Sequence, residues 1–324
     1  MNDGLFITWE QHRRALTLSS YLDIEYICLE TNLPFLFRYL CLGIRSIKVL
    51  LKKRPKILFV QNPSIILSTL ALLMKPIFKY KLIIDAHNIG VLWDRPGAIF
   101  FNNILKRLHK YTDLTIVSNS ALAETIEQNG GHGFIMPDPL PIPPRISSLE
   151  DSKPCNKFIV TFICTFSPDE PYQSVFETSE LTPNDIKIYV TGRPPKHVIN
   201  KKFNSDKIFL TGFLSEIDYW KQLASSDCVM DLTTRDDCLV CGAYEALALG
   251  KPIIISDTKV NRIFFYKGAV YTRSNPENIA RALINAKSQH AALKYMASEL
   301  QNELYQKSHQ NIERLISKVR NSTV

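Results

Sequence analysis

The chain has 324 residues, of which 45% are apolar and 22% charged, and a formal net charge of +8; these values suit a folded protein of two ordinary domains. No apolar run approaches the roughly 18 residues that a membrane-spanning helix needs, and the first residues lack the basic-then-apolar order of a secretory signal. The seven cysteines, scattered apart from Cys238 and Cys241, predict a reducing cytoplasm without a disulfide framework.

Short apolar runs alternate with helical patterns through the first part of the chain. Strands are predicted at 5–8, 24–29, 57–61, 82–85, 114–118 and 134–136. Helices are predicted between them at 13–21, 34–53, 64–78, 98–111 and 120–128. Strands separated by helices form right-handed βαβ units, so the alternation predicts a helix-covered parallel sheet in a first domain, residues 1–140.

Positive charge is concentrated in this first domain. Residues 31–81 contain ten Lys or Arg and no Asp or Glu, and FLFRYLCLGIRSIKVLLKKRPK places cations among apolar side chains at helical spacing. The pattern is typical of a helix on an anionic membrane surface, which predicts a peripheral position on the inner face of the cell membrane. A core-packed helix with a solvated basic face is the alternative. Nucleic acid is not expected as a partner, because no helix-turn-helix, RNP or zinc-finger signature is present.

A proline-rich segment then divides the chain, and 141–157 is assigned as an interdomain linker. The alternation resumes in a second domain over 158–300. Its strands are predicted at 158–164, 186–191, 208–211, 228–232, 252–255 and 269–271, and its helices near 171–180, 215–226, 240–249 and 276–287. A closing helical region spans about 288–320. Its last part, 301–324, is expected to be a C-terminal helix that can return to the first domain.

The predicted fold class is therefore α/β, with two Rossmann-like, doubly wound parallel-sheet domains facing a cleft. In such sheets ligands bind outside the carboxyl ends of the strands. The residues that directly follow each strand are consequently the candidates for binding and catalysis.

The segment 231–257, DLTTRDDCLVCGAYEALALGKPIIISD, is the most informative in the chain. A polar loop containing Asp237 and Cys238 precedes a short helix that carries Glu245. The amides of a helix N-terminus can bind phosphate, and a carboxylate one or two turns into the helix can accept hydrogen bonds from both hydroxyls of a ribose. We expect this segment to bind a nucleotide sugar. Cys238 and Cys241 alone could also be half of a redox or metal motif.

Two further loops of the second domain are candidates for donor binding. Gly192, Arg193 and Lys196 follow a predicted strand, where glycine permits close backbone approach to a phosphate and the two cations can stabilise a leaving diphosphate without a metal. The alternative is a solvated basic loop. Thr165 and Ser167 follow another strand, in ICTFSPDEP, and Ser167 could equally cap the next helix.

The candidate catalytic residues follow the strand 82–85 in the first domain. Asp85 could act as a general base on an acceptor hydroxyl, and His87 could contact the donor sugar. Asp94, on the following loop, is an alternative base. The structural alternatives are that Asp85 caps the next turn and that His87 is a satisfied polar group.

Several cofactor and metal motifs are absent from the sequence. It has no P-loop, no G-x-G-x-x-G after the first strand, no G-x-S-x-G and no H-E-x-x-H. The one D-x-acid match, Asp23 to Glu25, lies in a predicted strand and makes a poor metal site. We therefore expect neither a cofactor nor a metal requirement.

Five segments, in the right order, resemble GT-B glycosyltransferases of the family 4 type over nearly the whole chain: IIDAHNIG, TIVSNSALAETI with IMPDPLPIPP, TFSPDEP, YVTGRPP and DDCLVCGAYEALALGKPIIISD. The closest resemblance is to the β-1,4-mannosyltransferases that build chitobiosyl-diphospho-dolichol oligosaccharides and to bacterial relatives in polysaccharide assembly, which carry a similar S-W-T-x-D-E-D. The resemblance implies that Glu245 holds the ribose, that Asp237 faces the donor sugar, that the loop after Thr191 helps to hold the diphosphate, and that the acceptor is lipid-linked at a membrane.

The chain departs from the family 4 pattern in three places. No Arg/Lys pair occurs between Thr165 and Tyr172, Asp237 stands where the family has Glu, and the N-terminal loop reads WEQHRR and has no Gly-rich turn. The leading expectation is a metal-independent hexosyltransferase that moves a hexose, with mannose favoured, from a GDP- or UDP-sugar to a lipid-linked or growing glycan in cell-surface polysaccharide assembly. The alternatives are a non-catalytic membrane-associated partner with the same fold and a GT-B-like sugar-nucleotide epimerase.

Overall fold

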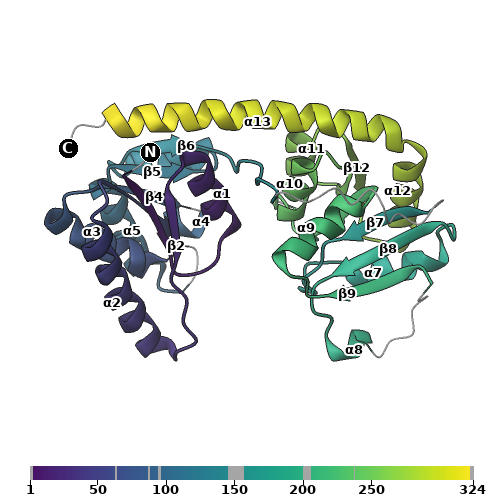
Figure 1. The fold of residues 1–324 in the computed structure, drawn as a ribbon, viewed down its shortest axis with the longest axis horizontal. Coiled ribbons are helices and arrows are strands. Elements are labelled where there is room, and N and C mark those ends of the chain that lie inside the picture. The colour runs from purple at the N-terminus through teal and green to yellow at the C-terminus, as the bar shows by residue number, and fades with distance from the viewer. Residues whose placement is uncertain are drawn as a thin grey trace. The chain divides into compact units, whose positions relative to one another are not determined.

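The computed structural model describes residues 3–62, 64–86, 88–93, 96–144, 157–199, 206–236 and 238–321. The chain divides into two compact units, one formed by Met1–Pro139 with Lys307–Val324 and the other by Leu140–Gln306. Each unit is built around one parallel sheet with helices on both faces, as Figure 1 shows.

The first sheet has six parallel strands in the order β2-β1-β3-β4-β5-β6. The strands are β1 (Gly4–Thr8), β2 (Glu25–Cys28), β3 (Ile57–Asn62), β4 (Lys81–Ala86), β5 (Leu114–Val117) and β6 (Gly133–Ile135). Because β2 and β3 lie on opposite sides of β1, the direction of winding reverses between β1 and β3. Ligands of doubly wound sheets bind at such a switch point.

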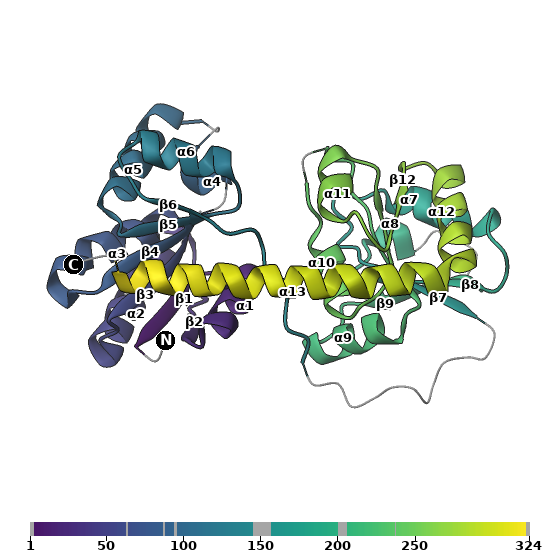
Figure 2. The same ribbon diagram turned by 90° about the horizontal axis from the view of Figure 1, so that it is seen from above.

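The helices of the first unit are α1 (Arg13–Leu22), α2 (Phe35–Lys53), α3 (Ile65–Phe78), α4 (Asn88–Val91), α5 (Ala98–Tyr111) and α6 (Ser120–Gln128). Successive side chains of a strand point to opposite faces. Phe6 of β1 therefore packs against α1 and the end of the last helix, α13 (His290–Asn321), on one face. Leu5 and Ile7 pack on the other face, which α2, α3, α5 and α6 cover. Figure 2 shows α13 lying over the strands of this sheet.

The second sheet is also six-stranded and parallel, in the order β12-β11-β10-β7-β8-β9. Its strands are β7 (Phe158–Phe162), β8 (Ile186–Thr191), β9 (Ile208–Gly212), β10 (Cys228–Asp231), β11 (Ile253–Ser256) and β12 (Ala269–Thr272). The chain winds from β7 through β8 to β9 on one side and continues with β10 on the other. The switch point of this sheet therefore lies between β7 and β10.

The helices of the second unit are α7 (Tyr172–Glu177), the 3-10 helix η2 (Thr178–Glu180), α8 (Lys196–Ile199), α9 (Glu216–Ser225), α10 (Cys241–Ala248), α11 (Lys259–Phe264), α12 (Pro276–Ser288) and the first part of α13. On one face α7 and α12 pack against β7 and β8. On the other face α9, α10 and α13 enclose the side chains of Trp220, Val229 and Ile253.

The unit boundaries differ from the predicted domain boundaries. Leu140 is buried among the side chains of the second unit, and the hydroxyl of Tyr305 donates to the carbonyl oxygen of Pro141 at 3.4 Å. The second unit therefore begins at Leu140 rather than after a linker ending at 157, although residues 145–156 of that linker lie outside the described residues. The last helix passes from the second unit to the first at Lys307, not at 301.

The predicted strands and longer helices are all present, within a few residues of their expected limits. The short helices α4, α8 and α11 were not expected. Within the described ranges, no helix has both the length and the apolar character needed to cross a membrane.

Candidate functional site

The loop after β7, at the switch point of the second sheet, is organised by Glu170. Its Oε2 accepts hydrogen bonds from the backbone amides of Thr165 at 2.8 Å and Ser167 at 2.9 Å, and its Oε1 accepts from the hydroxyl of Thr165 at 3.0 Å. Phe166 between them has a φ of +62°. Ser167 does not cap α7, which begins five residues later at Tyr172. Thr165 and Ser167, both predicted donor-binding residues, thus lie at the switch point in a loop that Glu170 holds tightly turned.

The loop after β8 packs closely on the loop after β7. The backbone amide of Cys164 donates to the hydroxyl of Thr191 at 3.1 Å. Gly192 has a φ of +91°, and a Cβ atom there would overlap the carbonyl oxygen of Cys164. Glycine is therefore required at 192 by the packing of two loops, and its predicted close approach to a phosphate stays a prediction.

The two predicted cations of this loop, Arg193 and Lys196, are exposed. Lys196 is exposed at the start of α8. The guanidinium carbon of Arg193 lies 4.9 Å from the ring centroid of Phe213, in the loop after β9. Phe213 is 71% exposed. An exposed aromatic face beside a cation can stack a planar ring such as a nucleobase. Phe213 was not among the predicted site residues, although an aromatic residue directly after Gly212 at a strand end is a usable signal.

Glu245 lies in the middle of α10 and is only 6% exposed. The hydroxyl of Tyr219, from α9, donates to its Oε2. This contact orients the carboxylate, a group whose oxygens can accept hydrogen bonds from a diol. The predicted ribose-binding role of Glu245 stays a prediction. Tyr219 was not anticipated, because α9 and α10 are brought together only by the fold.

A second buried carboxylate lies beneath the start of α10. Asp231, the last residue of β10, accepts a hydrogen bond from the backbone amide of Gly242 at 2.8 Å. Burial, with a smaller contribution from the nearby carboxylates of Glu170, Glu245 and Asp169, raises the pKa of Asp231 to about 8 against the opposing effect of the Gly242 amide. Asp231 therefore holds a proton through neutral pH. From the sequence, Asp231 was predicted only as part of the strand 228–232.

The switch point of the second sheet is thus rich in acids where the family 4 pattern has cations. Asp169 forms an ion pair with Arg235 at 3.1 Å and accepts a hydrogen bond from the hydroxyl of Thr233 at 3.1 Å. Among the described residues no group of three His, Cys, Asp or Glu side chains is arranged to hold a metal ion. Asp237 lies outside the described residues. Cys238 is half-buried, and burial raises the pKa of its thiol.

In the first unit the structure corrects the prediction for Asp85. Its carboxylate is fully buried, and Nε of Arg14 donates to both of its oxygens, at 2.9 and 3.1 Å. Arg14 also donates to the carbonyl oxygen of Met136 at 2.9 Å and pairs with Asp138. A carboxylate sealed in an ion pair cannot reach an acceptor hydroxyl, so the prediction of Asp85 as a general base is wrong. His87 and Asp94 lie outside the described residues.

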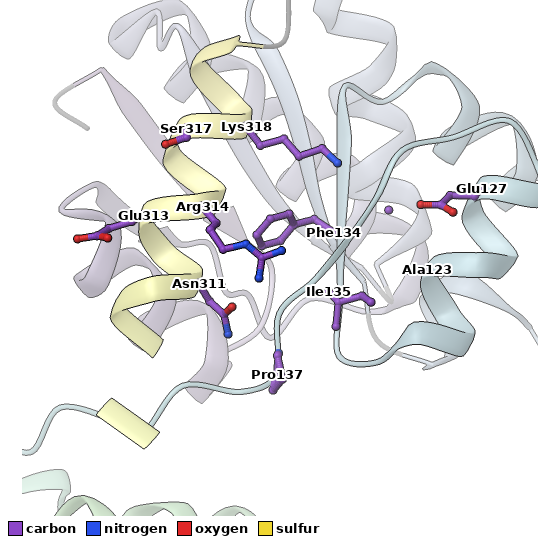
Figure 3. Close-up of a pocket in the computed structure, with 11 residues that line it drawn as sticks. Ala123, Glu127, Phe134, Ile135, Pro137, Asn311, Glu313, Arg314, Ser317 and Lys318 are labelled. Atoms are coloured by element: carbon purple, nitrogen blue, oxygen red, sulfur yellow. The ribbon is translucent and has the colours of Figure 1, made fainter. Parts of the chain in front are cut away.

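A groove of about 890 Å³ in the first unit runs along β6, between α6 and α13. Arg314 and Lys318 extend from α13 toward β6, and Glu127 lies on the opposite side (Figure 3). Among the residues that the structure describes, no predicted donor-binding or catalytic residue lines this groove.

No protein-family model and no curated protein sequence matches the chain. Solved structures do match it. One is Anabaena Alr3699/HepE in complex with UDP, at 14% identity and a TM-score of 0.66 over 99% of this chain and 100% of that one; related structures of the same protein contain UDP with glucose, and UDP-glucose.

Two further matches have comparable coverage. Sucrose-phosphate synthase from Thermosynechococcus elongatus matches at 10% identity and a TM-score of 0.70 over 99% of this chain and 100% of that one. A Listeria monocytogenes protein assigned as a UDP-N-acetylglucosamine 2-epimerase matches at 13% identity and a TM-score of 0.62, over 99% of this chain and 96% of that one. At these identities the likeness establishes the fold: the chain has the GT-B fold, as predicted.

Proposed function

We propose that the protein is a glycosyltransferase that moves a hexose from a nucleotide sugar to an acceptor at a membrane. The observation that carries this proposal is a pair of contacts on segments that follow strands of one Rossmann-like sheet: Arg193 lies over Phe213, and Tyr219 of α9 donates to Glu245 of α10. Aromatic, cationic and carboxylate groups are the chemistry needed for a base, a diphosphate and a ribose, respectively. The complexes of Anabaena HepE with UDP and UDP-glucose support a nucleotide-sugar donor.

Each proposed donor-binding residue is assigned to one part of the nucleotide sugar. Phe213 stacks on the base, and Glu245, oriented by Tyr219, accepts hydrogen bonds from the ribose hydroxyls. Arg193 and Lys196 face the diphosphate and stabilise the negative charge that grows on it as the bond to the sugar breaks. Asp237, beside Cys238, faces the donor sugar. We propose that these cations suffice without a metal ion. Mannose, carried by GDP, is favoured by the sequence resemblance.

The transfer itself requires a base, and the candidates from the sequence follow β4. The acceptor hydroxyl attacks the anomeric carbon, the bond from that carbon to the diphosphate breaks, and the hydroxyl proton passes to the base. Asp85 is excluded by its pairing with Arg14. We propose His87, which follows β4 directly, with Asp94 as the alternative.

The proposed membrane contact is a surface formed by α2, α3 and α5. Helix α3 packs beside both α2 and α5 (Figure 1). The three helices contain no Asp or Glu, with five Lys or Arg in α2, one in α3 and three in α5. They also expose large apolar side chains, including Phe37, Leu73, Ile77 and Ile99, of which Ile99 is 85% exposed. Cations among exposed apolar groups fit an anionic bilayer surface, as proposed for residues 31–81.

A groove on α5 extends the proposed contact beyond residues 31–81. It has a volume of about 570 Å³, and Phe100, Arg107, Lys110 and Tyr111 are among the residues that line it. An aromatic and cationic groove suits a lipid headgroup at the bilayer interface. The proposed setting is thus the cytoplasmic face of the cell membrane, where a lipid-linked or growing glycan would be the acceptor in polysaccharide assembly.

The function can be tested in two steps. A thermal-shift screen with GDP, UDP, ADP and their sugars identifies the donor, because a ligand that binds only the native state raises the melting temperature. Incubation with the labelled donor and membranes then tests transfer. A melting-temperature rise with one nucleotide and incorporation of label into the lipid fraction are expected. Failure of every nucleotide to change the melting temperature would contradict the proposal.

Two other functions are favoured by particular observations. The Listeria neighbour favours a sugar-nucleotide epimerase, which would convert UDP-N-acetylglucosamine with no acceptor present. The acids at the switch point of the second sheet, in place of cations, favour a non-catalytic partner. Such a partner would bind membranes and support no turnover with any donor.

A further inference from the structure

We infer that a pocket of about 290 Å³ in the first unit binds the phosphate group and adjoining sugar of a lipid-linked acceptor. The inference rests on the proposed transferase function and names the site and chemical class of its acceptor. The pocket lies at the switch point of the first sheet, where Trp9 follows β1, Gln61 lies near the end of β3, and Arg38 and Tyr39 come from α2. Such a position is where doubly wound sheets bind ligands.

Arg38 gives the pocket its preference for an anion. Its Nη2 donates to Oε1 of Glu10 at 3.0 Å, and the side chain of Glu10 is 78% exposed, so this ion pair is held weakly. Nε of Arg38 is buried and has no hydrogen-bond partner within the part of the chain that the structure describes. A buried N–H without an acceptor is unfavourable, and a phosphate oxygen would satisfy it. The planar guanidinium can hold such a phosphate through two parallel hydrogen bonds.

Two aromatic rings provide the surface for a sugar. The indole N–H of Trp9 donates to the hydroxyl of Ser46 at 2.9 Å, which fixes the ring in its buried position. The ring of Tyr39 lies 6.0 Å from that of Trp9. Rings that pair an apolar face with a polar edge suit a sugar, which has C–H groups and hydroxyls. The carboxylate of Glu10, at the same pocket, can accept a hydrogen bond from a sugar hydroxyl.

The same helix leads from the pocket to an apolar surface. The ring of Phe35, in the first turn of α2, lies 4.9 Å from that of Tyr39 and is 71% exposed. Phe37, Leu40 and Ile44 are exposed farther along α2. Exposed aromatic and aliphatic groups beside a cation match a ligand with a phosphate joined to a hydrocarbon chain. A soluble sugar phosphate would leave these side chains in water, so the observations favour a lipid phosphate.

The inference can be tested with geranylgeranyl phosphate in neutral phosphatidylcholine vesicles. Binding is followed through the tryptophan fluorescence of the folded full chain, and Trp9→Phe identifies the part of the signal that comes from the pocket. The matched control is Arg45→Gln, which removes a cation from the same helix outside the pocket. Phosphatidylglycerol vesicles without the probe measure general attraction to anionic lipid, and inorganic phosphate measures the contribution of the phosphate alone.

We expect saturable binding of the probe. Arg38→Gln should weaken the affinity for the probe about tenfold, as for the loss of one charge-assisted hydrogen bond, whereas Arg45→Gln should keep the affinity within about twofold of wild type. Both variants should lose similar affinity for phosphatidylglycerol vesicles. Equal weakening of probe binding by the two variants would overturn the inference, since the cations would then act only through general membrane charge. So would a probe response that Trp9→Phe leaves intact, or saturation by inorganic phosphate at the same concentration as the probe.

The nucleotide screen separates this inference from the proposed function. A nucleotide-induced rise in melting temperature without Arg38-dependent binding of the probe would contradict the lipid-phosphate site and leave the proposed transferase function supported. Probe binding that depends on Arg38, in a protein whose melting temperature no nucleotide changes, would overturn the transferase and leave the lipid-phosphate site standing.

Discussion

Arg14 donates from one nitrogen to both carboxylate oxygens of Asp85, and this buried pair joins the start of α1 to the end of β4. The same guanidinium reaches the carbonyl oxygen of Met136 and the carboxylate of Asp138, in the segment that follows β6. Three distant parts of the first unit are thus held by one cation. Burial opposes the charge of Arg14, but the two carboxylates raise its pKa above the usual value, so it stays protonated.

The first prediction is that Asp85→Asn impairs folding rather than chemistry. Removing one partner of a buried ion pair leaves the other without full compensation, and we expect the free energy of unfolding to fall by about 3–5 kcal/mol. Urea denaturation measures this change, and Asp3→Asn, at an exposed pair with Lys56, should give little change. A variant with wild-type stability and no transfer activity would show instead that Asp85 acts in the reaction.

The second prediction concerns Glu245 and Tyr219. Glu245→Gln should abolish the melting-temperature rise caused by the preferred nucleotide, because an amide is a weaker acceptor for the ribose hydroxyls than a carboxylate. Tyr219→Phe should reduce the rise, since the carboxylate loses the group that orients it. Glu277→Gln, at an exposed position in α12, is the control and should behave as wild type. An unchanged rise in a folded Glu245→Gln variant removes Glu245 from the site.

The third prediction is a pH dependence of stability at Asp231. Its pKa in the folded protein is about 8, above the usual value of an aspartate, so the folded state favours the protonated form. The resulting stability is fully present below the unfolded-state pKa and is lost as the pH rises through the folded-state value. Asp231→Asn, which cannot ionise, should therefore gain stability over wild type between about pH 4 and 8, by up to about 1.4 kcal/mol per pH unit.

Urea denaturation of both proteins across this range measures the gain. Above pH 8 the difference should level off, because Asp231 is then ionised in both states. A difference that is constant between pH 4 and 9 would mean that the folded protein does not hold a proton on Asp231.

The fourth prediction compares two glycines with positive φ. Both Gly192 and Gly212 have a backbone conformation that costs an L-residue about 1–2 kcal/mol. A Cβ at 212 meets nothing within 4 Å, whereas a Cβ at 192 overlaps the Cys164 carbonyl oxygen. The free energy of unfolding should therefore fall by about 1–3 kcal/mol more in Gly192→Ala than in Gly212→Ala, which is the usual cost of overpacking. Equal losses in urea denaturation would show that the loops after β7 and β8 are not packed as described.

The fifth prediction tests the membrane surface through α5. Changing Lys106, Arg107 and Lys110 to Glu should weaken binding to anionic vesicles by at least about 1 kcal/mol per cation, and the remaining binding should be less sensitive to salt because its electrostatic part is smaller. The control changes Lys259, Arg281 and Lys294, exposed cations of the second unit, to Glu and gives the same net charge. Equal effects of the two triple variants in vesicle co-sedimentation would argue against a defined surface.

The strands were predictable because burial on both faces leaves continuous apolar runs, as in residues 82–84 and 253–255. The long helices were predictable because their buried side chains recur every three or four residues. Helices α4 and α8 have four residues each and α11 has six, which is too short for that period to show.

The site was less predictable than the fold, since it depends on contacts between residues far apart in sequence. The position of Glu245 follows from the spacing within one segment. The pairing of Asp85 with Arg14, 71 residues earlier, cannot be read from local spacing. In a sequence, an exposed acid that follows a strand cannot be distinguished from one that is buried in an ion pair. Asp231 was overlooked because a carboxylate in an apolar strand is unexpected, and its partner, the amide of Gly242, lies beyond the following loop.

Helix α13 makes the first unit discontinuous in sequence. Ile312, Leu315 and Val319 are buried against Phe6 and Phe134, and the carbonyl oxygen of Val319 accepts a hydrogen bond from Lys81 at 2.8 Å. During synthesis, the side of the first sheet that carries these contacts stays without them until the last turns of α13 have left the ribosome. The core of the first unit is therefore completed after that of the second unit. Translation that stops before the end of α13 would release a chain with an exposed, aggregation-prone apolar face.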